Sequence, residues 1–284
     1  IIAKFKRDNG LTYDRSQILV SAGAKHTIFN LMQALLDDGD EVIIPAPYWV
    51  SYPDMALLAG GVPVIVSAGP EQGYKIRPEQ LAAAITPKTK LFILNSPSNP
   101  TGAAYTRAEL EALGEVLLAH PQVVIGTDDM YEHIWWGPEP FCSLVTACPG
   151  LYDRTVTING VSKSYAMTGW RIGYCGGPPE VIKAMATLQG QSTSNPTSIS
   201  QAAATVALNA DQTCVHEMNK HFKARHDWLV NPGRPIPEEA SAVHKITDEM
   251  VADAPSFADI AQELARALEG TVPAAYNAPF DRGF

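Results

Sequence analysis

The sequence predicts an α/β fold: a mostly parallel sheet with helices on both faces, followed by part of a smaller α/β domain. Short apolar runs alternate with amphipathic segments through residues 1–209, which is typical of a parallel sheet whose crossovers are helices. After Asn209 the chain becomes more polar and passes through a proline-rich loop at 231–235. We therefore expect a large domain over residues 1–225, with a truncated N-terminus, and a partial or divergent small domain over 226–284.

The individual elements are predicted by apolar spacing and by the residues that begin or end them. The first clear helix is predicted by apolar residues that fall on one face, namely Ile28, Leu31, Met32, Leu35 and Leu36, with Gly39 as its expected end. Strands are expected over 41–44 (closed by Pro45), 62–66, 91–94, 123–126 and 156–158. Further helices are expected from Pro78 to about Thr86, over 107–119 and 216–228, and after Ser256 until Gly270. Ligands of such sheets bind at the carboxyl ends of the strands, so the loops there are the first place to seek chemistry.

Composition excludes several classes of function. Charged residues make up 18% of the chain, and 21 basic against 30 acidic residues leave a formal net charge of −9, which argues against binding to nucleic acid or to an anionic membrane. No run of eighteen apolar residues and no charged-then-apolar leader is present. Four scattered cysteines without a C-x-x-C pair fit a reducing cytoplasm. Because the chain begins at Ile1 without methionine and stops abruptly at Phe284, we expect it to be a fragment of a longer protein.

The stretch richest in chemistry runs from Asn159 to Gly173 and reads NGVSKSYAMTGWRIG. Lys163 stands between small residues just after an expected strand, where its amine can approach a planar ligand closely. Arg171, eight residues later, suits a doubly charged phosphate because a guanidinium can donate two parallel hydrogen bonds to it. A lone lysine in a loop is usually a solvated surface charge, so the argument depends on the whole string. That string resembles the cofactor-lysine signature of class I pyridoxal-phosphate-dependent aminotransferases, which are fold type I proteins.

Four further segments resemble the same family, in its order and at compatible spacing. They are Ser21 to Lys25, before the first helix; the aromatic segment Pro45 to Tyr52; the N-P-T-G loop within Asn95 to Gly102; and Thr127 to Glu132, like the family's S-D-E-x-Y-E segment. The last two follow predicted strands. The resemblance covers roughly residues 1–225 and is nearest to the bacterial subgroup of aspartate and prephenate aminotransferases.

The resemblance implies catalytic roles for residues around the cofactor ring. Lys163 would hold pyridoxal 5'-phosphate as a Schiff base and, once displaced by the substrate amine, move the Cα proton. Asp128 would pair with the pyridine nitrogen; its alternative is a helix or turn cap, a role we expect of neighbouring Asp129 instead. Tyr131 and Asn99 would hydrogen-bond the ring oxygen. Asn99 is also a turn residue before Pro100, and both interpretations can hold.

Phosphate binding is implied for a second group of residues. Arg171, Ser162 and the backbone N–H groups of Ala24 and Lys25, which follow Gly23 at a helix start, would hold the phosphate, since unpaired donors and the helix dipole favour an anion there. Gly160 stands where some relatives carry a phosphate-binding serine, so one contact fewer is expected.

Stacking on the ring is implied for the aromatic segment. Trp49 would lie against the ring face and, with Asn99, near the substrate. A buried core role for Trp49 and a stacking role for Tyr48 remain the alternatives.

The function implied is transfer of an amino group between an amino acid and a 2-oxo acid by a ping-pong mechanism, in a homodimer with sites at the interface. Aspartate or glutamate is the expected amino donor, with aromatic or prephenate-type substrates as the alternative; Gln33, where some aspartate-preferring relatives have lysine, weakens the dicarboxylic expectation. A β-eliminating lyase would instead release pyruvate and ammonia. A non-catalytic domain of a transcription regulator would carry a basic helix-turn-helix, which nothing here resembles, and no glycine fingerprint of a dinucleotide-binding enzyme opens the first helix.

In the family, a partner-subunit tyrosine would lie before Ile1 and the substrate-carboxylate arginine past Phe284. The family's Gly-Ala-Phe segment is absent after Val230.

Overall fold

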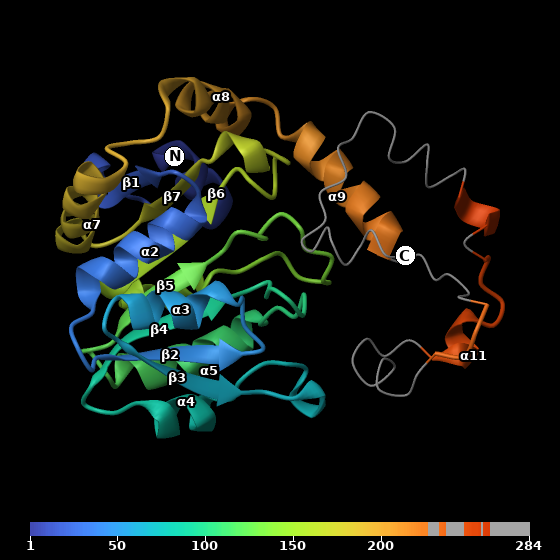
Figure 1. The fold of residues 1–284 in the computed structure, drawn as a ribbon, viewed down its shortest axis with the longest axis horizontal. Helices are drawn as coiled ribbons and strands as arrows, with labels where there is room; N and C mark the ends of the chain where they lie inside the picture. Colours follow the sequence, from blue (N-terminus) through green and yellow to red (C-terminus); the bar gives the residue numbers. More distant parts are fainter. Residues whose placement is uncertain (227–232, 237–246, 257, 262–284) are drawn as a thin grey trace. The chain divides into compact units, whose positions relative to one another are not determined.

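The computed structural model describes residues 1–226, 233–236, 247–256 and 258–261 (Figure 1). The chain divides into two compact units, Ile1–Lys220 and His221–Phe284. In the second unit, the short helix α11 (Asp248–Val251) begins at Thr247, whose side chain accepts a hydrogen bond from the Met250 N–H. Most of the helix predicted after Ser256 lies outside the described residues, and the predicted boundary at residue 225 stays a prediction.

Seven strands of the first unit form one sheet, in the order β1-β7-β6-β5-β4-β2-β3. Strand β7 is antiparallel to both of its neighbours, and the other pairs are parallel. The mostly parallel sheet predicted from the sequence is therefore confirmed. The strands are β1 (Ile18–Ser21), β2 (Glu41–Ala46), β3 (Val62–Ser67), β4 (Thr89–Asn95), β5 (Val124–Asp128), β6 (Thr155–Gly160) and β7 (Gly173–Gly176).

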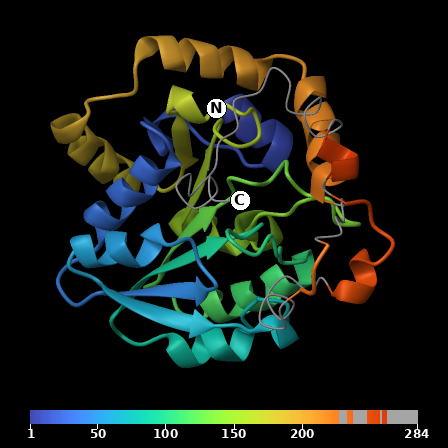
Figure 2. The same cartoon turned by 45° about the vertical axis from the view of Figure 1, so that its right-hand side comes forward.

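Helices cover both faces of the sheet (Figures 1 and 2). Side chains of β4 alternate between two cores: Leu91 and Ile93 pack with α2, α3 and α7, whereas Phe92 and Leu94 pack with α4, α5 and α6. Both cores are closed to water, which is why the central strands read as continuous apolar runs in the sequence. The helices of this unit are α1 (Ile2–Lys4), α2 (Ala24–Leu35), α3 (Ser51–Leu58), α4 (Pro78–Ala84), α5 (Arg107–Leu118), α6 (Leu144–Ala147), α7 (Pro179–Ser192) and α8 (Ser198–Asn209). Helix α9 (Thr213–His226) follows them in the chain.

Two expected ends of elements were wrong. Pro45 does not close its strand, because β2 continues to Ala46 beside β3. The described pairing of β2 with β4 ends at Ile43, so Pro45 has no ladder bond to donate on that side and its missing N–H is tolerated. Gly39 does not end the first helix, since α2 stops at Leu35 and the next residue is already extended.

The antiparallel strand β7 brings the loop after β1 and the loop between β6 and β7 together, at the carboxyl ends of β1 and β6. Its first residue, Gly173, pairs with Ser21 at the end of β1 and with Gly160 at the end of β6. A Cβ on Gly173 would lie 2.1 Å from the backbone nitrogen of Ala24. Glycine is therefore required where β7 meets the start of α2, and this contact positions the helix start beside the loop that carries Lys163.

Among the described residues, no helix is both long enough and apolar enough to cross a membrane.

Candidate active site

The predicted site residues gather at the carboxyl edge of the parallel strands. Asp128 is the last residue of β5 and pairs in register with Asn95, the last residue of β4. Both therefore belong to strands, whereas the sequence placed them in the loops that follow. Lys163 does lie in the loop after β6, as expected. The amide of Asn95 donates to the backbone carbonyl of Asp128 over 2.8 Å, which ties the two strand ends together.

Asp128 is buried and held by a tyrosine that sequence reasoning did not identify. The hydroxyl of Tyr52 donates to Asp128 Oδ2 over 2.6 Å, and the Met130 N–H approaches Oδ1 at 3.4 Å. Burial raises the pKa of Asp128, while the Tyr52 hydrogen bond and the nearby charge of Lys163 act against that rise. Tyr52 ends the aromatic segment Pro45 to Tyr52, but its contact with a residue 76 positions away leaves no local signal.

Lys163, Tyr131 and Asn99 lie together beside this carboxylate. The ammonium of Lys163 is 5.6 Å from the centre of the Tyr131 ring. The Asn99 amide reaches the Tyr131 hydroxyl at 3.5 Å, and the Asn99 N–H donates to Asn95 Oδ1 over 2.7 Å. Burial and the charge of Asp128 raise the pKa of Tyr131, so its hydroxyl is a proton donor at neutral pH. Asn99 thus has one contact within its own turn and one with Tyr131, and its expected hydrogen bond to the ring oxygen stays a prediction.

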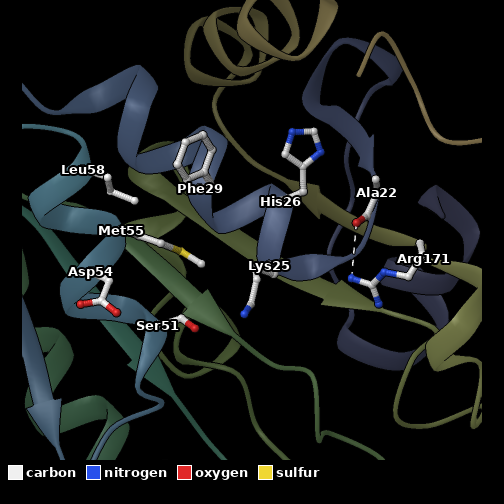
Figure 3. A pocket seen from close by; sticks show the side chains of 9 residues that line it. All are labelled: Ala22, Lys25, His26, Phe29, Ser51, Asp54, Met55, Leu58 and Arg171. Atoms are coloured by element: carbon white, nitrogen blue, oxygen red, sulfur yellow. Dashed lines mark hydrogen bonds between the residues drawn. The ribbon is translucent and has the colours of Figure 1, made fainter. Parts of the chain in front are cut away.

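Two of the expected phosphate-binding residues, Lys25 and Arg171, line a cavity of about 430 Å³, whereas Ser162 and Ala24 are not among its lining residues. Figure 3 shows Lys25 on α2 and Arg171 from the loop before β7, with Phe29, Met55 and Leu58 around the apolar end. The Arg171 guanidinium donates to the carbonyls of Thr168 (2.9 Å) and Ala22 (3.5 Å). This arrangement leaves two cationic side chains near the start of a helix, where an anion is favoured.

Gly23 permits the close approach of Arg171 to the helix start. It has a φ of 92°, and a Cβ there would lie 2.2 Å from Arg171 Nη2. As the residue before α2, it offers no side chain to cap the N–H groups of Ala24 and Lys25. A glycine at this point therefore leaves both the guanidinium and the helix start accessible to a ligand.

Gly160 is the last residue of β6, and Ser162 follows it in the loop that carries Lys163. Ser162 is buried, close to Lys163 in the chain. A Cβ at Gly160 would lie 2.8 Å from the Ile172 carbonyl oxygen, because β6 and β7 pair there. A side chain at this position would therefore not fit without a backbone shift. The phosphate contact expected to be missing here stays a prediction.

Trp49 is half-buried rather than a closed core residue. Its ring packs edge-on against Tyr52 with centroids 5.4 Å apart, and the Lys25 ammonium lies 4.8 Å from it. Trp49 thus joins the residues around Asp128 to the cationic end of the cavity. Tyr48 is half-buried as well and packs on the same core, so the choice between the two aromatic residues stays open.

Asp129 does not act as the helix or turn cap that we expected. Its side chain is buried, and Oδ2 has no hydrogen-bond partner among the described residues. Burial raises the pKa of Asp129 to about 8, so the group holds a proton at neutral pH. Asp129 follows β5, which ends at Asp128, and the two carboxyl groups enter different surroundings: that of Asp128 is bonded to Tyr52, whereas Oδ2 of Asp129 has no such partner.

Comparison with known proteins gives the chain relatives along most of its length. An aspartate/prephenate aminotransferase of Nitrosomonas europaea is 52% identical over 266 residues, which are 94% of this chain and 66% of that protein. One from Cereibacter sphaeroides is 60% identical over 231 residues, 81% of this chain and 58% of that protein. The chain thus spans about three fifths of the length of these relatives.

The fold is also that of solved aminotransferases. The crystal structure of the aspartate aminotransferase from Rhizobium meliloti matches with a TM-score of 0.78 and 54% identity, over 80% of this chain and 56% of that one. A mutant of the Thermus thermophilus aspartate aminotransferase matches with a TM-score of 0.75 and 45% identity, over 79% and 58%.

Two protein families match the sequence, and they overlap. An exonuclease family matches residues 198–284, which are less than half of the chain and only about half of which the structure describes. That range includes the region after Val230 where the Gly-Ala-Phe segment is absent, so the predicted small domain stays a prediction. The aminotransferase class I and II family matches residues 1–232. Since this match includes every strand of the sheet and every predicted site residue, the chain belongs to the class I and II aminotransferase family.

Proposed function

We propose that the protein of which this chain is part is a pyridoxal-phosphate-dependent aminotransferase. The observation that carries the proposal is the meeting of an amine, a buried carboxylate and a guanidinium at one sheet edge: Lys163, Asp128 and Arg171. The residues fit the cofactor. Gly23 leaves room beside the Arg171 guanidinium that a Cβ would fill, and the buried Asp128 keeps one oxygen free of the Tyr52 hydrogen bond. The names of the relatives and the family match support the same reaction class.

In this proposal each residue has one physical task. Bound pyridoxal phosphate would supply an electron sink for negative charge at the substrate Cα. Lys163 would be the covalent attachment point and afterwards the base that carries the Cα proton. Asp128 would hold a proton on the pyridine nitrogen, and Tyr131 with Asn99 would donate to the ring oxygen.

The remaining site residues would hold the phosphate and the ring. Arg171, Ser162 and the N–H groups of Ala24 and Lys25 would bind the phosphate beside Gly23. Trp49 would cover one face of the ring and, together with Asn99, border the substrate.

We propose aspartate or glutamate with a 2-oxo acid as the substrate pair. The names of the relatives support this choice. Gln33 does not argue for it, since its amide donates to the Leu58 carbonyl over 3.1 Å and offers no cationic charge for a distal carboxylate. A prephenate-type acceptor is the alternative, supported by the names of two relatives.

We also propose a homodimer and a cytoplasmic location. The match to the class I and II aminotransferase family supports the first. The free thiols of all four cysteines, three of them buried, support the second.

Absorbance titration with pyridoxal phosphate tests the cofactor. The chain should develop a protein-bound band with one cofactor per chain, and borohydride should then fix the cofactor mass on the peptide that contains Lys163. Lys163→Ala should show neither, whereas Lys183→Ala, which changes an exposed lysine on α7, should show both. A fixed cofactor on any other lysine would overturn the assignment.

Half-reactions with single amino acids then separate transfer from elimination. Transfer leaves the 2-oxo acid and an aminated cofactor in equal amounts. Release of pyruvate and ammonia from a β-substituted alanine, without amination of the cofactor, would instead identify a lyase.

A further inference from the structure

A buried polar cluster behind the proposed site joins the N-terminal segment to two of its loops. The segment comprises α1 and the π-helical turn η1 (Phe5–Asn9). Lys4 and Glu132 form an ion pair in which both side chains are almost fully buried, with exposed fractions of 1% and 3%. Neither residue touches the proposed cofactor pocket, and no role was expected for either from the sequence.

Glu132 accepts hydrogen bonds from three separate parts of the chain. Its Oε1 pairs with the Lys4 ammonium and accepts a hydrogen bond from the Asn159 amide (2.7 Å). Its Oε2 accepts a hydrogen bond from the Asn9 amide (2.7 Å). Lys4 in turn donates to Asn9 Oδ1 over 2.8 Å. The carboxylate is therefore satisfied by a fixed set of donors, which is the condition for a buried charge to hold one geometry.

The two ends of this network adjoin the catalytic loops. Glu132 directly follows Tyr131, and Asn159 lies four residues before Lys163. The side-chain Oδ1 of Asn159 also accepts a hydrogen bond from the Gly160 N–H over 2.7 Å, where β6 ends. A single carboxylate therefore bridges the loop that carries Tyr131 and the strand that leads to Lys163.

We propose that Glu132 and Lys4 are positioning residues that fix Tyr131 relative to Lys163. The inference rests on the proposed function of these two residues. Lys4 supplies the counter-charge that lets Glu132 remain buried, and Glu132 supplies the bridge between the two loops. Loss of the bridge lets the loops separate. A misplacement of ~1 Å between reacting groups costs on the order of a hundredfold in rate.

The test uses four variants of the whole chain. Lys4→Met leaves the buried Glu132 carboxylate without its ammonium partner, and Glu132→Gln leaves Lys4 with Asp8 at 3.9 Å as its remaining carboxylate among the described residues. The double variant removes both charges of the pair and should recover stability. Lys4→Arg keeps the charge and the donors. The matched control is Lys75→Met/Glu109→Gln, which removes an ion pair of 2.6 Å far from the site.

The first readout needs no cofactor. Acetic anhydride labels lysine amines in the cofactor-free chain, and mass spectrometry compares Lys163 with the exposed Lys183 in the same digest. Lys163 is half-buried against Tyr131, so loosening of the loops should raise its relative labelling by about threefold or more. The rise should persist in the stable double variant and disappear in Lys4→Arg. The second readout is kinetic: kcat of the loaded double variant should fall at least about tenfold with KM little changed.

Recovery of stability together with wild-type labelling in the double variant would overturn the inference, because the pair would then serve folding alone. If the double variant does not fold, Asn159→Leu removes the donor that joins Glu132 to β6 at similar volume and leaves the ion pair in place. Unchanged Lys163 labelling in folded Asn159→Leu would also overturn the inference. Failure of pyridoxal phosphate to bind would reject the proposed function, yet the labelling result would stand by itself.

Discussion

Replacing Tyr52 by phenylalanine should move the protonation of Asp128 and, with it, the pH range in which the cofactor binds. The hydroxyl of Tyr52 donates to Asp128 Oδ2 over 2.6 Å, and both side chains are buried, at 2% and 6% exposure. A hydrogen bond to a charged acceptor contributes about 1.5–3 kcal/mol. Since one pKa unit corresponds to about 1.4 kcal/mol, the pKa of Asp128 should rise by roughly one to two units in Tyr52→Phe.

The assay is the dissociation constant of pyridoxal phosphate measured between pH 5 and 9. Asp128 must be ionised to hold the protonated pyridine nitrogen, so affinity should be lost toward acid pH, and in Tyr52→Phe the loss should begin about one to two pH units higher. At alkaline pH the two curves should converge. Tyr13→Phe is the matched control, because Tyr13 is equally buried and donates to Thr157 (3.1 Å) instead of to Asp128. A Tyr52→Phe curve that is displaced equally at every pH, with an unchanged midpoint, would refute the reasoning.

Three further substitutions test individual contacts. Asp129→Asn should abolish a pH dependence of stability: the pKa of Asp129 is raised from its ordinary 3.8 to about 8, so the native state keeps a proton that the unfolded chain releases, and stability falls as pH rises through that window. Urea unfolding should show the variant gaining up to about 1.4 kcal/mol on the wild type for each pH unit between 4 and 8, and parallel curves would contradict this. Gly23→Ala should weaken pyridoxal phosphate binding at least about tenfold, because its Cβ would displace Arg171. Gly39→Ala is the control in the same absorbance titration, since its φ is also positive (86°) but its surroundings are open. Gly114→Ala should destabilise α5 in urea unfolding, because a Cβ only 2.1 Å from Cys148 Sγ costs about 1–3 kcal/mol of overpacking against about 1 kcal/mol gained in helix propensity. A stabilised Gly114→Ala would show that Cys148 moves aside at little cost.

The central strands and the helices between them were predictable because burial on both faces leaves continuous apolar runs. Phe92 to Leu94 and Ile125 are examples, each closed to water in the structure. The side of the sheet formed by β1 and β7 was not predictable in this way. Strand β1 has four residues, and β7 reads Gly-Tyr-Cys-Gly, too short and too rich in glycine to show a period. Helix α3 was also missed, because its exposed Leu57 and Leu58 break the amphipathic pattern.

At the site, the family motifs placed the predicted residues in one region, but they could not show which neighbours tune them. Asp128 and Asp129 are the same residue type at adjacent positions, yet the first ends β5 and is bonded to Tyr52, whereas the second follows the strand and is kept protonated by burial. The partners of Glu132 come from positions 4, 9 and 159. Such contacts depend on the tertiary fold, which no local spacing encodes.

Because β7 runs antiparallel to β6, the loop between them sets the size of ligand that the proposed site can hold. The chain leaves the sheet after Gly160, the last residue of β6, and re-enters it at Gly173, so the loop that carries Lys163 and Arg171 is anchored at both ends to one pair of neighbouring strands. The reach from amine to guanidinium is then a property of one loop, independent of the spacing of the parallel strands. If the site has the proposed function, lengthening that loop would alter the size of ligand that fits between the two groups while leaving the sheet intact.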